Sequence, residues 1–211
     1  MNILVIGATG RVGKKLVNQL SLKGHTIYAG SRNPSLINNT KKIIPIQFDL
    51  KEDIKINTLK MKLIDAVYFV AGSRSTDLFQ SDLFGSVKAM QSAEEAGVNR
   101  FIHLSGIFAT EPEKWNPNMS SSMKDYYIAK FFSDRWLIDN TNLEYTILQP
   151  GTLTEEDGSG LVEFDIKEYG NNSIDDVVAV LVEVLEKENT YKKIISMHQG
   201  NTPVAEAVNN V

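Results

Sequence analysis

Residues 2–13 read NILVIGATGRVG, and this stretch decides the fold of the chain. Its apolar first half predicts a strand, and Gly7, Gly10 and Gly13 follow where a loop leads into a helix. In such a loop the first glycine permits a tight turn, the second lets the backbone approach a pyrophosphate, and the third permits close helix–strand contact. The helix N-terminus then attracts the phosphate charge. We therefore expect a dinucleotide site here, with a glycine-rich turn that binds nothing as the alternative.

Outside this loop, short apolar segments alternate with longer segments of helical periodicity. Several of the apolar segments lack polar residues altogether, which is typical of strands covered on both faces. The pattern predicts an α/β fold, a Rossmann-type, doubly wound, mostly parallel sheet with helices on both faces, in one domain over residues 1–211. Gly24 and Gly97 stand where two helices should end. The expected strands are 2–6, 26–29, 43–48, 66–70, 100–104, 145–148 and 193–197, and the expected helices are 11–22, 79–96, 123–139 and 174–186.

The composition limits the classes of function. Hydrophobic residues make up 42% of the chain and charged residues 23%, which is typical of a folded protein. A formal net charge of −4 lacks the positive surplus that binding to nucleic acid requires. The chain has no Cys and only three scattered His, so no metal site and no disulfide is expected. No apolar run is long enough to span a bilayer, and the N-terminus does not resemble a signal peptide. We expect a cytoplasmic protein that binds a small molecule and neither nucleic acid nor membrane.

Two segments interrupt the alternation of strands and helices. Residues 106–122 are polar and contain Pro112, Pro117 and an isolated Trp115, whereas residues 152–169 are acidic. Both follow expected strands, so both should lie at the carboxyl edge of the sheet, where ligands bind in open α/β folds. We therefore expect residues 106–122 and 151–170 to form the substrate side of the site. Trp115 either covers the site as a lid or anchors its loop.

The end of the second expected strand indicates which dinucleotide is bound. An acidic residue at this position would bind the ribose of NAD, but the sequence has Ser31 and Arg32. A planar guanidinium suits a 2′-phosphate, so NADP (NADPH) is predicted rather than NAD. A solvated loop cation is the alternative for Arg32. Asp49 ends the third expected strand, where it either meets the adenine amino group or caps the next helix.

These features, together with further motifs, resemble the short-chain dehydrogenase/reductase superfamily. The motifs are Asp49-Leu50, Ala71-Gly72 and Tyr126-Tyr127-Ile128-Ala129-Lys130. The chain is more closely similar to the atypical branch of compact NAD(P)-binding proteins, which includes NmrA-like oxidoreductases and sugar epimerases. The turn Gln149-Pro150-Gly151 and the closing segment 200–207 extend the resemblance over nearly the whole chain. The resemblance implies cofactor contacts from Gly7, Thr9, Gly10, Arg11, Val12, Gly13, Ser31, Arg32, Asp49, Leu50, Ala71, Gly72, Lys130, Pro150, Gly151 and Thr152.

The resemblance also implies a catalytic set of Ser105, Tyr126, Lys130 and Asp82. Tyr126 and Lys130 are one helical turn apart and should share a face. Lys130 would favour the tyrosinate and bind the nicotinamide ribose, while Tyr126 would exchange a proton with the substrate oxygen. Ser105 would position a substrate carbonyl, with a strand-end cap as the alternative. Asp82 stands where the superfamily usually has Asn, and it cannot donate a hydrogen bond to a proton relay as an amide does. His103 is expected to be a core histidine rather than a base.

Two interpretations from different classes follow. The first is an NADP-dependent oxidoreductase or epimerase that transfers a hydride at a small carbonyl, hydroxyl or quinone-like substrate. The second is a non-catalytic NADP(H)-binding redox sensor or regulator, which resemblance to the NmrA-like branch permits. Asp82 favours the sensor, whereas Ser105, Tyr126 and Lys130 favour the enzyme. The chain of 211 residues leaves little room for a large substrate domain, so a bulky nucleotide sugar is not expected. The oligomeric state is not predicted.

Overall fold

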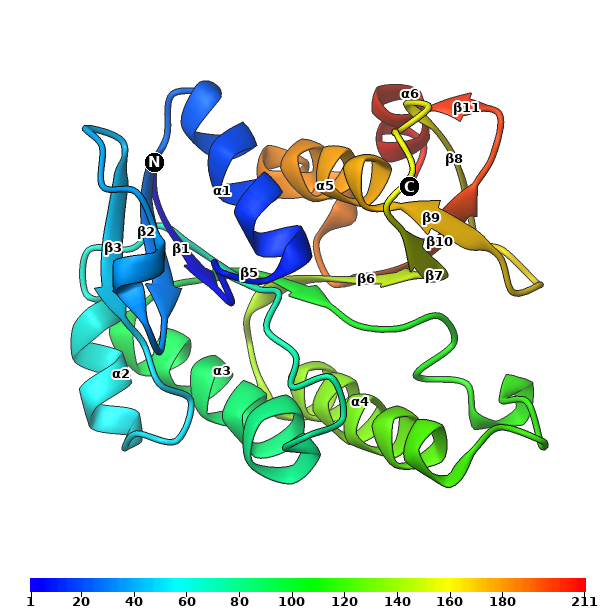
Figure 1. Ribbon diagram of the computed structural model, residues 1–211, viewed down its shortest axis with the longest axis horizontal. Helices are drawn as coiled ribbons and strands as arrows, with labels where there is room; N and C mark the ends of the chain where they lie inside the picture. Colours follow the sequence, from blue (N-terminus) through cyan, green and yellow to red (C-terminus); the bar gives the residue numbers. More distant parts are fainter.

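A nine-stranded sheet runs through the computed structural model, which describes residues 1–211 (Figure 1). Its strands are β1 (Asn2–Ile6), β2 (Thr26–Ser31), β3 (Ile43–Gln47), β4 (Ala66–Phe69), β5 (Arg100–Leu104), β6 (Glu144–Pro150), β8 (Leu161–Phe164), β10 (Lys193–Gln199) and β11 (Thr202–Pro203). They follow the order β11-β8-β10-β6-β5-β4-β1-β2-β3. All neighbours from β3 to β10 are parallel, whereas β8 runs antiparallel to both β10 and β11. The predicted Rossmann-type, mostly parallel sheet is confirmed.

Helices cover both faces of this sheet (Figure 1). One face carries α1 (Arg11–Leu22), α5 (Ile174–Glu183) and α6 (Val204–Asn209). The other carries α2 (Ile54–Met61), α3 (Phe84–Ala96) and α4 (Ser121–Asn140). Alternate residues of β1 pack against the helices on opposite faces of the sheet, because successive side chains of a strand point to opposite faces. Ile3 and Val5 join the core under α1 and α5, and Leu4 and Ile6 join the core under α2, α3 and α4.

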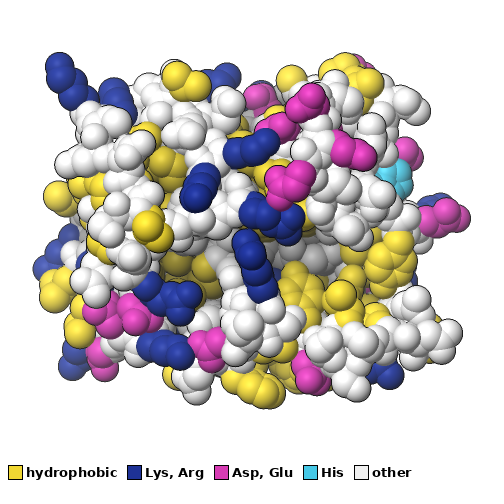
Figure 2. Space-filling model, viewed as in Figure 1, with side chains coloured by type: hydrophobic (Ala, Val, Ile, Leu, Met, Phe, Trp, Pro, Cys, Tyr) yellow, Lys and Arg dark blue, Asp and Glu magenta, His cyan; other side chains and the backbone are white.

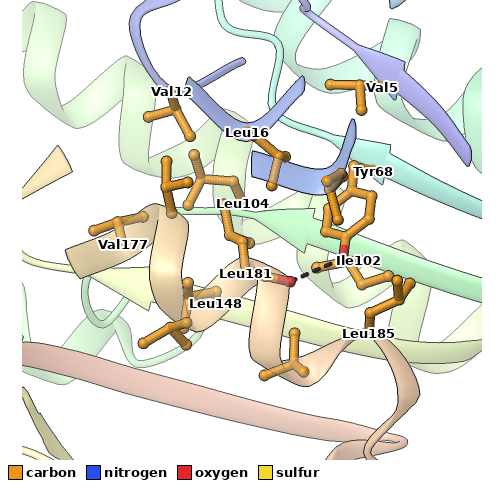
Figure 3. Close-up of a cluster of buried hydrophobic side chains, with 14 of the residues drawn as sticks. Val5, Val12, Leu16, Tyr68, Ile102, Leu104, Leu148, Val177, Leu181 and Leu185 are labelled. Atoms are coloured by element: carbon orange, nitrogen blue, oxygen red, sulfur yellow. Dashed lines mark hydrogen bonds between the residues drawn. The ribbon is translucent and has the colours of Figure 1, made fainter. Parts of the chain in front are cut away.

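The core under α1 and α5 fixes the start of α1, and therefore the glycine loop before it (Figure 3). Val12 and Leu16 of α1 and Val177 and Leu181 of α5 lie in one cluster with strand side chains. The Tyr68 hydroxyl donates to the Leu181 carbonyl over 2.8 Å, which pairs the one polar atom that this strand sends into the cluster. Each buried aliphatic side chain contributes about 1.5–3 kcal/mol, so α1 is held firmly against the sheet.

The start predicted for the helix over residues 79–96 is wrong. A π-helical turn occupies Leu78–Leu83, and α3 begins only at Phe84. The turn carries Asp82 into the interior, where the side chain is 1% exposed and its two oxygens accept from the Ser73 amide at 3.0 and 3.2 Å. Wide turns of this kind are common at functional sites. The end predicted for this helix is confirmed, because Gly97 caps it with a φ of +78°.

Several short elements were not predicted, mostly around the substrate side. Residues 152–169, where no strand or helix was predicted, contain β7 (Thr152–Thr154) and β8, and β7 pairs with β9 (Asn171–Ser173) in a separate two-stranded sheet. Helices α2 and α6 were missed as well, and so was β11. These elements are too short to show a clear period, and α2 buries only Asn57 and Met61. No helix of the chain has the length and apolar character that crossing a bilayer requires.

Candidate functional site

The glycine loop lies where the direction of the sheet order reverses. β1 pairs with β2 on one side and with β4 on the other, and the helices that follow β1 and β4 cover opposite faces. Such a switch point leaves a crevice at the carboxyl ends of the strands. Gly7 turns the chain here with a φ of +96°, and its amide donates to the Gly30 carbonyl over 3.2 Å. A Cβ at Gly7 would lie 2.7 Å from the Cα of Ala71 on the other side of the crevice.

The three glycines of the loop have different reasons to lack a side chain. A Cβ at Gly13 would lie 2.1 Å from the Gly7 carbonyl oxygen, so the packing of the chain itself requires this glycine. A Cβ at Gly10 would meet only the same oxygen, at 3.2 Å, and the φ of −71° suits any residue. Gly10 also caps α1 without a side-chain acceptor, which leaves the first amides of the helix free to bind an anion. The loop therefore fits a dinucleotide phosphate.

The end of β2 carries the residues predicted to select the dinucleotide. Ser31 Oγ lies 3.3 Å from Thr9 Oγ1 and accepts from the Asn33 amide at 3.1 Å. Arg32 is exposed and forms no ion pair. Asp49 accepts from the Lys51 amide at 2.9 Å. The proposed capping role of Asp49 is wrong, because Asp53 caps α2.

Charged side chains surround the start of α1. Figure 2 shows Lys and Arg side chains gathered in the middle of one face, with Asp and Glu side chains beside them. The predicted cofactor contact Arg11 pairs with Glu155 at 3.0 Å, and Lys15 pairs with Asp175 at 2.6 Å. Val12 buries its side chain in the core, so only its backbone is available to a ligand. A phosphate that approached the Arg11 side chain would compete with Glu155.

Helix α4 points a row of polar residues toward the ends of β5 and β6. Tyr126, Lys130 and Asp134 follow at intervals of four residues, which places them on one face of the helix. Lys130 is buried and its Nζ donates to the Leu104 carbonyl over 3.0 Å. Asp134 is fully buried and accepts from Ser105 Oγ at 2.7 Å and from Gln149 Nε2 at 3.0 Å. The Ser105 hydroxyl thus donates its hydrogen bond to Asp134, so it can only accept a hydrogen bond from a ligand.

His103 lies beside Asp134 and is buried in the core, as expected. Its Nε2 is 3.2 Å from Asp134 Oδ1, and its ring stacks on Phe69 with centroids 5.2 Å apart. Burial lowers the pKa of His103, which leaves the imidazole neutral at pH 7. The Nδ1 atom has no hydrogen-bond partner. His103 is therefore a neutral neighbour of the polar row.

The tyrosine of this row has a different electrostatic setting from the one expected. Burial raises the pKa of Tyr126, and the charges of Asp82 and Asp134 raise it further. The expectation that Lys130 would favour the tyrosinate stays a prediction, and in the free protein the effects of burial and the two carboxylates are larger. The phenol borders Gly106 at the end of β5, where a Cβ would lie 3.3 Å from its oxygen. Tyr126 is thus a protonated donor at the carboxyl edge of the sheet.

The two segments predicted for the substrate side contact each other. Trp115 Nε1 donates to the Phe108 carbonyl over 2.9 Å, and the indole packs edge-on against Tyr127. These contacts identify Trp115 as an anchor of its loop and not as a lid. The Tyr169 hydroxyl donates to the Lys114 carbonyl over 3.1 Å, and its ring meets that of Phe108 with centroids 5.2 Å apart. This contact joins the loop after β5 to the segment after β6.

Several predicted cofactor residues serve the packing of the chain. The Gly151 amide donates to Asn172 Oδ1 over 2.8 Å, and a Cβ at Gly151 would lie 2.1 Å from the Gly170 carbonyl oxygen. The Pro150 carbonyl accepts from the Ile107 amide, and the Thr152 amide donates to the Gly170 carbonyl. Leu50 packs against α3, because a Cβ added at Gly85 would lie 2.8 Å from the Cβ of Leu50. Gly72 lies next to Asp82, since an added Cβ there would lie 3.4 Å from Asp82 Oδ1.

Sequence reasoning did not identify Asp134, Gln149 or Asn172 as members of the site. Asp134 had a visible signal, because it follows Lys130 by one helical turn on the face that carries Tyr126. Gln149 and Asn172 had none, because each acquires its partner only through the packing of distant segments. The Asn172 amide, for example, accepts from Gly151 across 21 residues of the chain.

Comparison with known proteins gives a consistent result over the whole chain. The model of a protein family described as NAD(P)H-binding matches residues 7–188. The protein UPF0659 YMR090W of Saccharomyces cerevisiae is 34% identical, and the match covers 100% of this chain and 99% of that one. The Bacillus subtilis protein YhfK, named an uncharacterized sugar epimerase, is 31% identical over 99% of both chains. The crystal structure of the oxidoreductase ylbE from Lactococcus lactis is 41% identical, with a TM-score of 0.96 over 100% of this chain and 96% of that one.

Proposed function

The chain belongs to the NAD(P)H-binding family, and on this basis we propose that it is an NADP-dependent oxidoreductase or epimerase. Its substrate is a small molecule with a carbonyl, hydroxyl or quinone-like group. One observation carries the proposal: a glycine loop built for a phosphate and the Tyr126–Lys130 pair open at the same edge of the sheet. The bound nicotinamide supplies the hydride chemistry, and the residues of the chain orient the substrate and move its proton.

The preference for NADP rests on the residues that follow β2. Ser31 and Arg32 occupy the place where a carboxylate would select NAD. Arg32 is exposed and has no carboxylate partner, so its guanidinium is available for a 2′-phosphate. Thr9 Oγ1, which is 3.3 Å from Ser31 Oγ, adds a second hydroxyl at the same point.

The proton chemistry rests on Tyr126. Because burial and the charges of Asp82 and Asp134 keep its phenol protonated, Tyr126 is suited to donate a proton to a substrate oxygen. Because the Ser105 proton is held by Asp134, Ser105 Oγ does not position a carbonyl oxygen as the resemblance implied, and it accepts a hydrogen bond only from a hydroxyl of the substrate. Lys130, whose Nζ donates to the Leu104 carbonyl, supplies an amino group for the nicotinamide ribose, and burial lowers its pKa.

A second candidate is a dinucleotide-binding redox sensor without turnover. The observation in its favour is Asp82, whose two carboxylate oxygens both accept from the Ser73 amide. Asp82 therefore donates no hydrogen bond to a proton relay. In this case the phenol of Tyr126 would serve binding and not proton transfer.

Two measurements test these proposals. Titration calorimetry with NADPH and NADH measures the cofactor preference, and tighter binding of NADPH is expected. A screen of aldehydes, ketones and quinones, followed by loss of nicotinamide absorbance, then separates the enzyme from the sensor. Equal affinities would contradict the role of Arg32, and tight NADPH binding without turnover of any acceptor would favour the sensor.

A further inference from the structure

Large apolar side chains are exposed on α4 and on the two elements before it that pack against it. Five of them keep a third or more of their surface exposed, and they are Phe79 (71%), Phe84 (51%), Ile128 (41%), Phe132 (56%) and Trp136 (36%). The first two lie on the π-helical turn and at the start of α3, and both of these elements pack against α4. Ser86 Oγ of α3 lies 2.7 Å from Ser133 Oγ of α4, so the two helices run side by side (Figure 1). We call these five side chains the α4 surface.

Helix α4 is apolar on two opposite sides. Its inner side buries Tyr127 and Leu137. Its outer side presents Ile128, Phe132 and Trp136, which follow at intervals of four residues and therefore form one stripe. A surface helix normally turns a polar side to water, whereas a helix that is apolar all round is covered all round. The outer stripe of α4 thus has the character of a side that another surface covers.

The size of the α4 surface fits one half of a protein interface. The exposed parts of its five side chains amount to about 500 Å², since a whole aromatic side chain presents about 150–250 Å². A standard interface buries about 800 Å² on each partner, and about 60% of that area is apolar. The α4 surface therefore supplies the apolar area that one partner of a stable complex needs.

The charges at the ends of the outer stripe indicate which partner fits. The residues that follow at intervals of three, four and three on this side are Asp125, Ile128, Phe132 and Arg135. This is the spacing of a seam between two packed helices. If two antiparallel copies of α4 bring Ile128 against Phe132 of the other copy, Asp125 lies opposite Arg135 of the other copy. A parallel pair would place Asp125 opposite Asp125, and an antiparallel pair centred on Phe132 would place it opposite Asp139. Only the first arrangement pairs opposite charges.

Both members of this charge pair are available to a second copy. Asp125 is exposed and forms no ion pair within the chain. Arg135 is exposed and pairs with Asp139 of its own helix at 2.7 Å. A guanidinium has five N–H donors, so it can bind a second carboxylate without releasing the first.

We propose that the α4 surface is the interface of a symmetric dimer, in which α4 packs antiparallel against α4 of a second copy of this chain. Ile128 and Phe132 of the two copies form its apolar centre, and an Asp125–Arg135 ion pair flanks this centre at each end, because every contact of a two-fold interface occurs twice. Phe84 and its neighbours in the α4 surface extend the apolar contact beside the seam. This inference is independent of the proposed cofactor and reaction.

The first test measures the mass of the full chain by sedimentation equilibrium. We use protein concentrations from about 1 to about 100 μM, because interfaces of standard size have dissociation constants in the micromolar range or below. The expected mass is twice the 23.5 kDa of one chain. Phe132→Glu should raise the dissociation constant about hundredfold, because it puts two charges into the apolar centre. Leu22→Glu is the matched control and should dimerise as the wild type does, because Leu22 is equally exposed but ends α1 on the other face of the sheet.

The second test addresses the arrangement of the two helices. Asp125→Arg places like charges opposite each other at both ends of the seam, and Arg135→Asp does the same with the opposite sign. Each variant alone should therefore dimerise about tenfold more weakly than the wild type. An equimolar mixture of the two variants restores both ion pairs between unlike copies, so it should dimerise about as strongly as the wild type.

A protein that stays monomeric at every concentration would overturn the inference and leave the α4 surface to a different protein. A dimer that persists in Phe132→Glu would overturn it too, because the interface would then lie elsewhere. A mixture of the two charge variants that dimerises no better than each variant alone would overturn the antiparallel arrangement. All of these measurements are made without NADPH, so their outcome is separate from that of the proposed function.

Discussion

The glycine loop offers a prediction in which folding and cofactor binding separate. Gly10→Ala adds a Cβ that would meet only the Gly7 carbonyl oxygen, at 3.2 Å, in a backbone conformation open to any residue. Alanine is a poorer N-cap than glycine, so the free energy of unfolding should fall by less than about 1 kcal/mol. Gly13→Ala adds a Cβ 2.1 Å from the same oxygen, which belongs to rigid backbone. The forced shift should cost about 3 kcal/mol, partly offset by the better helix propensity of alanine.

The measurements are urea unfolding for stability and calorimetric titration with NADPH for binding. Gly10→Ala should unfold within about 1 kcal/mol of the wild type and yet bind NADPH on the order of tenfold to a hundredfold more weakly, because overpacking against a ligand costs about 1–3 kcal/mol. Gly13→Ala should melt several degrees lower, about 2–4 °C for each kcal/mol in a domain of this size. Wild-type NADPH affinity in a folded Gly10→Ala protein would show that the loop is only a turn.

Three further predictions address other parts of the molecule. Arg32→Ala should weaken NADPH about tenfold to a hundredfold and leave NADH unchanged, since a charge-assisted phosphate contact contributes about 1.5–3 kcal/mol; an unchanged ratio in calorimetry would contradict this role. Tyr126→Phe should lower turnover of an accepted carbonyl about 10²–10⁴-fold. Because the pKa of Tyr126 is raised above its ordinary value of 10.0, the total tyrosinate absorbance of the variant should equal that of the wild type below about pH 11. Arg100→Met should lower the free energy of unfolding by about 2–4 kcal/mol, because the buried guanidinium donates to the carbonyls of Glu144, Val184 and Leu185; a urea midpoint equal to that of the wild type would refute it.

Two tyrosines with raised pKa values also predict how stability depends on pH. Burial raises the pKa of Tyr68 and of Tyr126 in the folded state, while the unfolded phenols keep the ordinary value of 10.0. Above this pH the unfolded state binds fewer protons than the folded state, so the free energy of unfolding should fall as pH rises. Urea unfolding between pH 8 and 11 checks this, and Tyr126→Phe should show a shallower fall. Constant stability over this range would mean that neither phenol has a raised pKa in the folded state.

The fold could be predicted because its signals are local. The loop from Gly7 to Gly13 and the apolar segments around it are contiguous in sequence, and Gly97 marks a helix end by its own conformational freedom. The elements that were missed depend on tertiary contacts. β8 pairs with β10 and with β11, β11 pairs with β8 alone, and neither strand shows a period of its own. The π-helical turn that buries Asp82 has no sequence signature either.

The candidate site was predictable in its residue types and not in its hydrogen bonds. Tyr126, Lys130 and Ser105 do lie along one face of α4 and the end of β5. The direction of the Ser105 proton, however, is set by Asp134, whose burial depends on how α4 packs against the sheet. The pKa of Tyr126 depends on the same packing and on Asp82, which comes from another element. A motif gives the spacing of its members but not the charges that tertiary structure places around them.

The charges around Tyr126 also set the starting state of the proposed chemistry. Oxidation of a hydroxyl, which begins an epimerisation, requires Tyr126 to accept a proton as tyrosinate, and burial together with Asp82 and Asp134 opposes that form. Reduction of a carbonyl starts from the protonated phenol, which the same surroundings favour, but a phenol that gives its proton is left as tyrosinate. Both directions therefore pass through the disfavoured form, and they differ in the pH at which their starting state is populated. Asp134→Asn removes one charge that raises the pKa of Tyr126, so the rise with pH of the kcat for oxidation of an alcohol substrate should shift to lower pH than in the wild type. An unshifted pH profile would show that Tyr126 is not the proton acceptor.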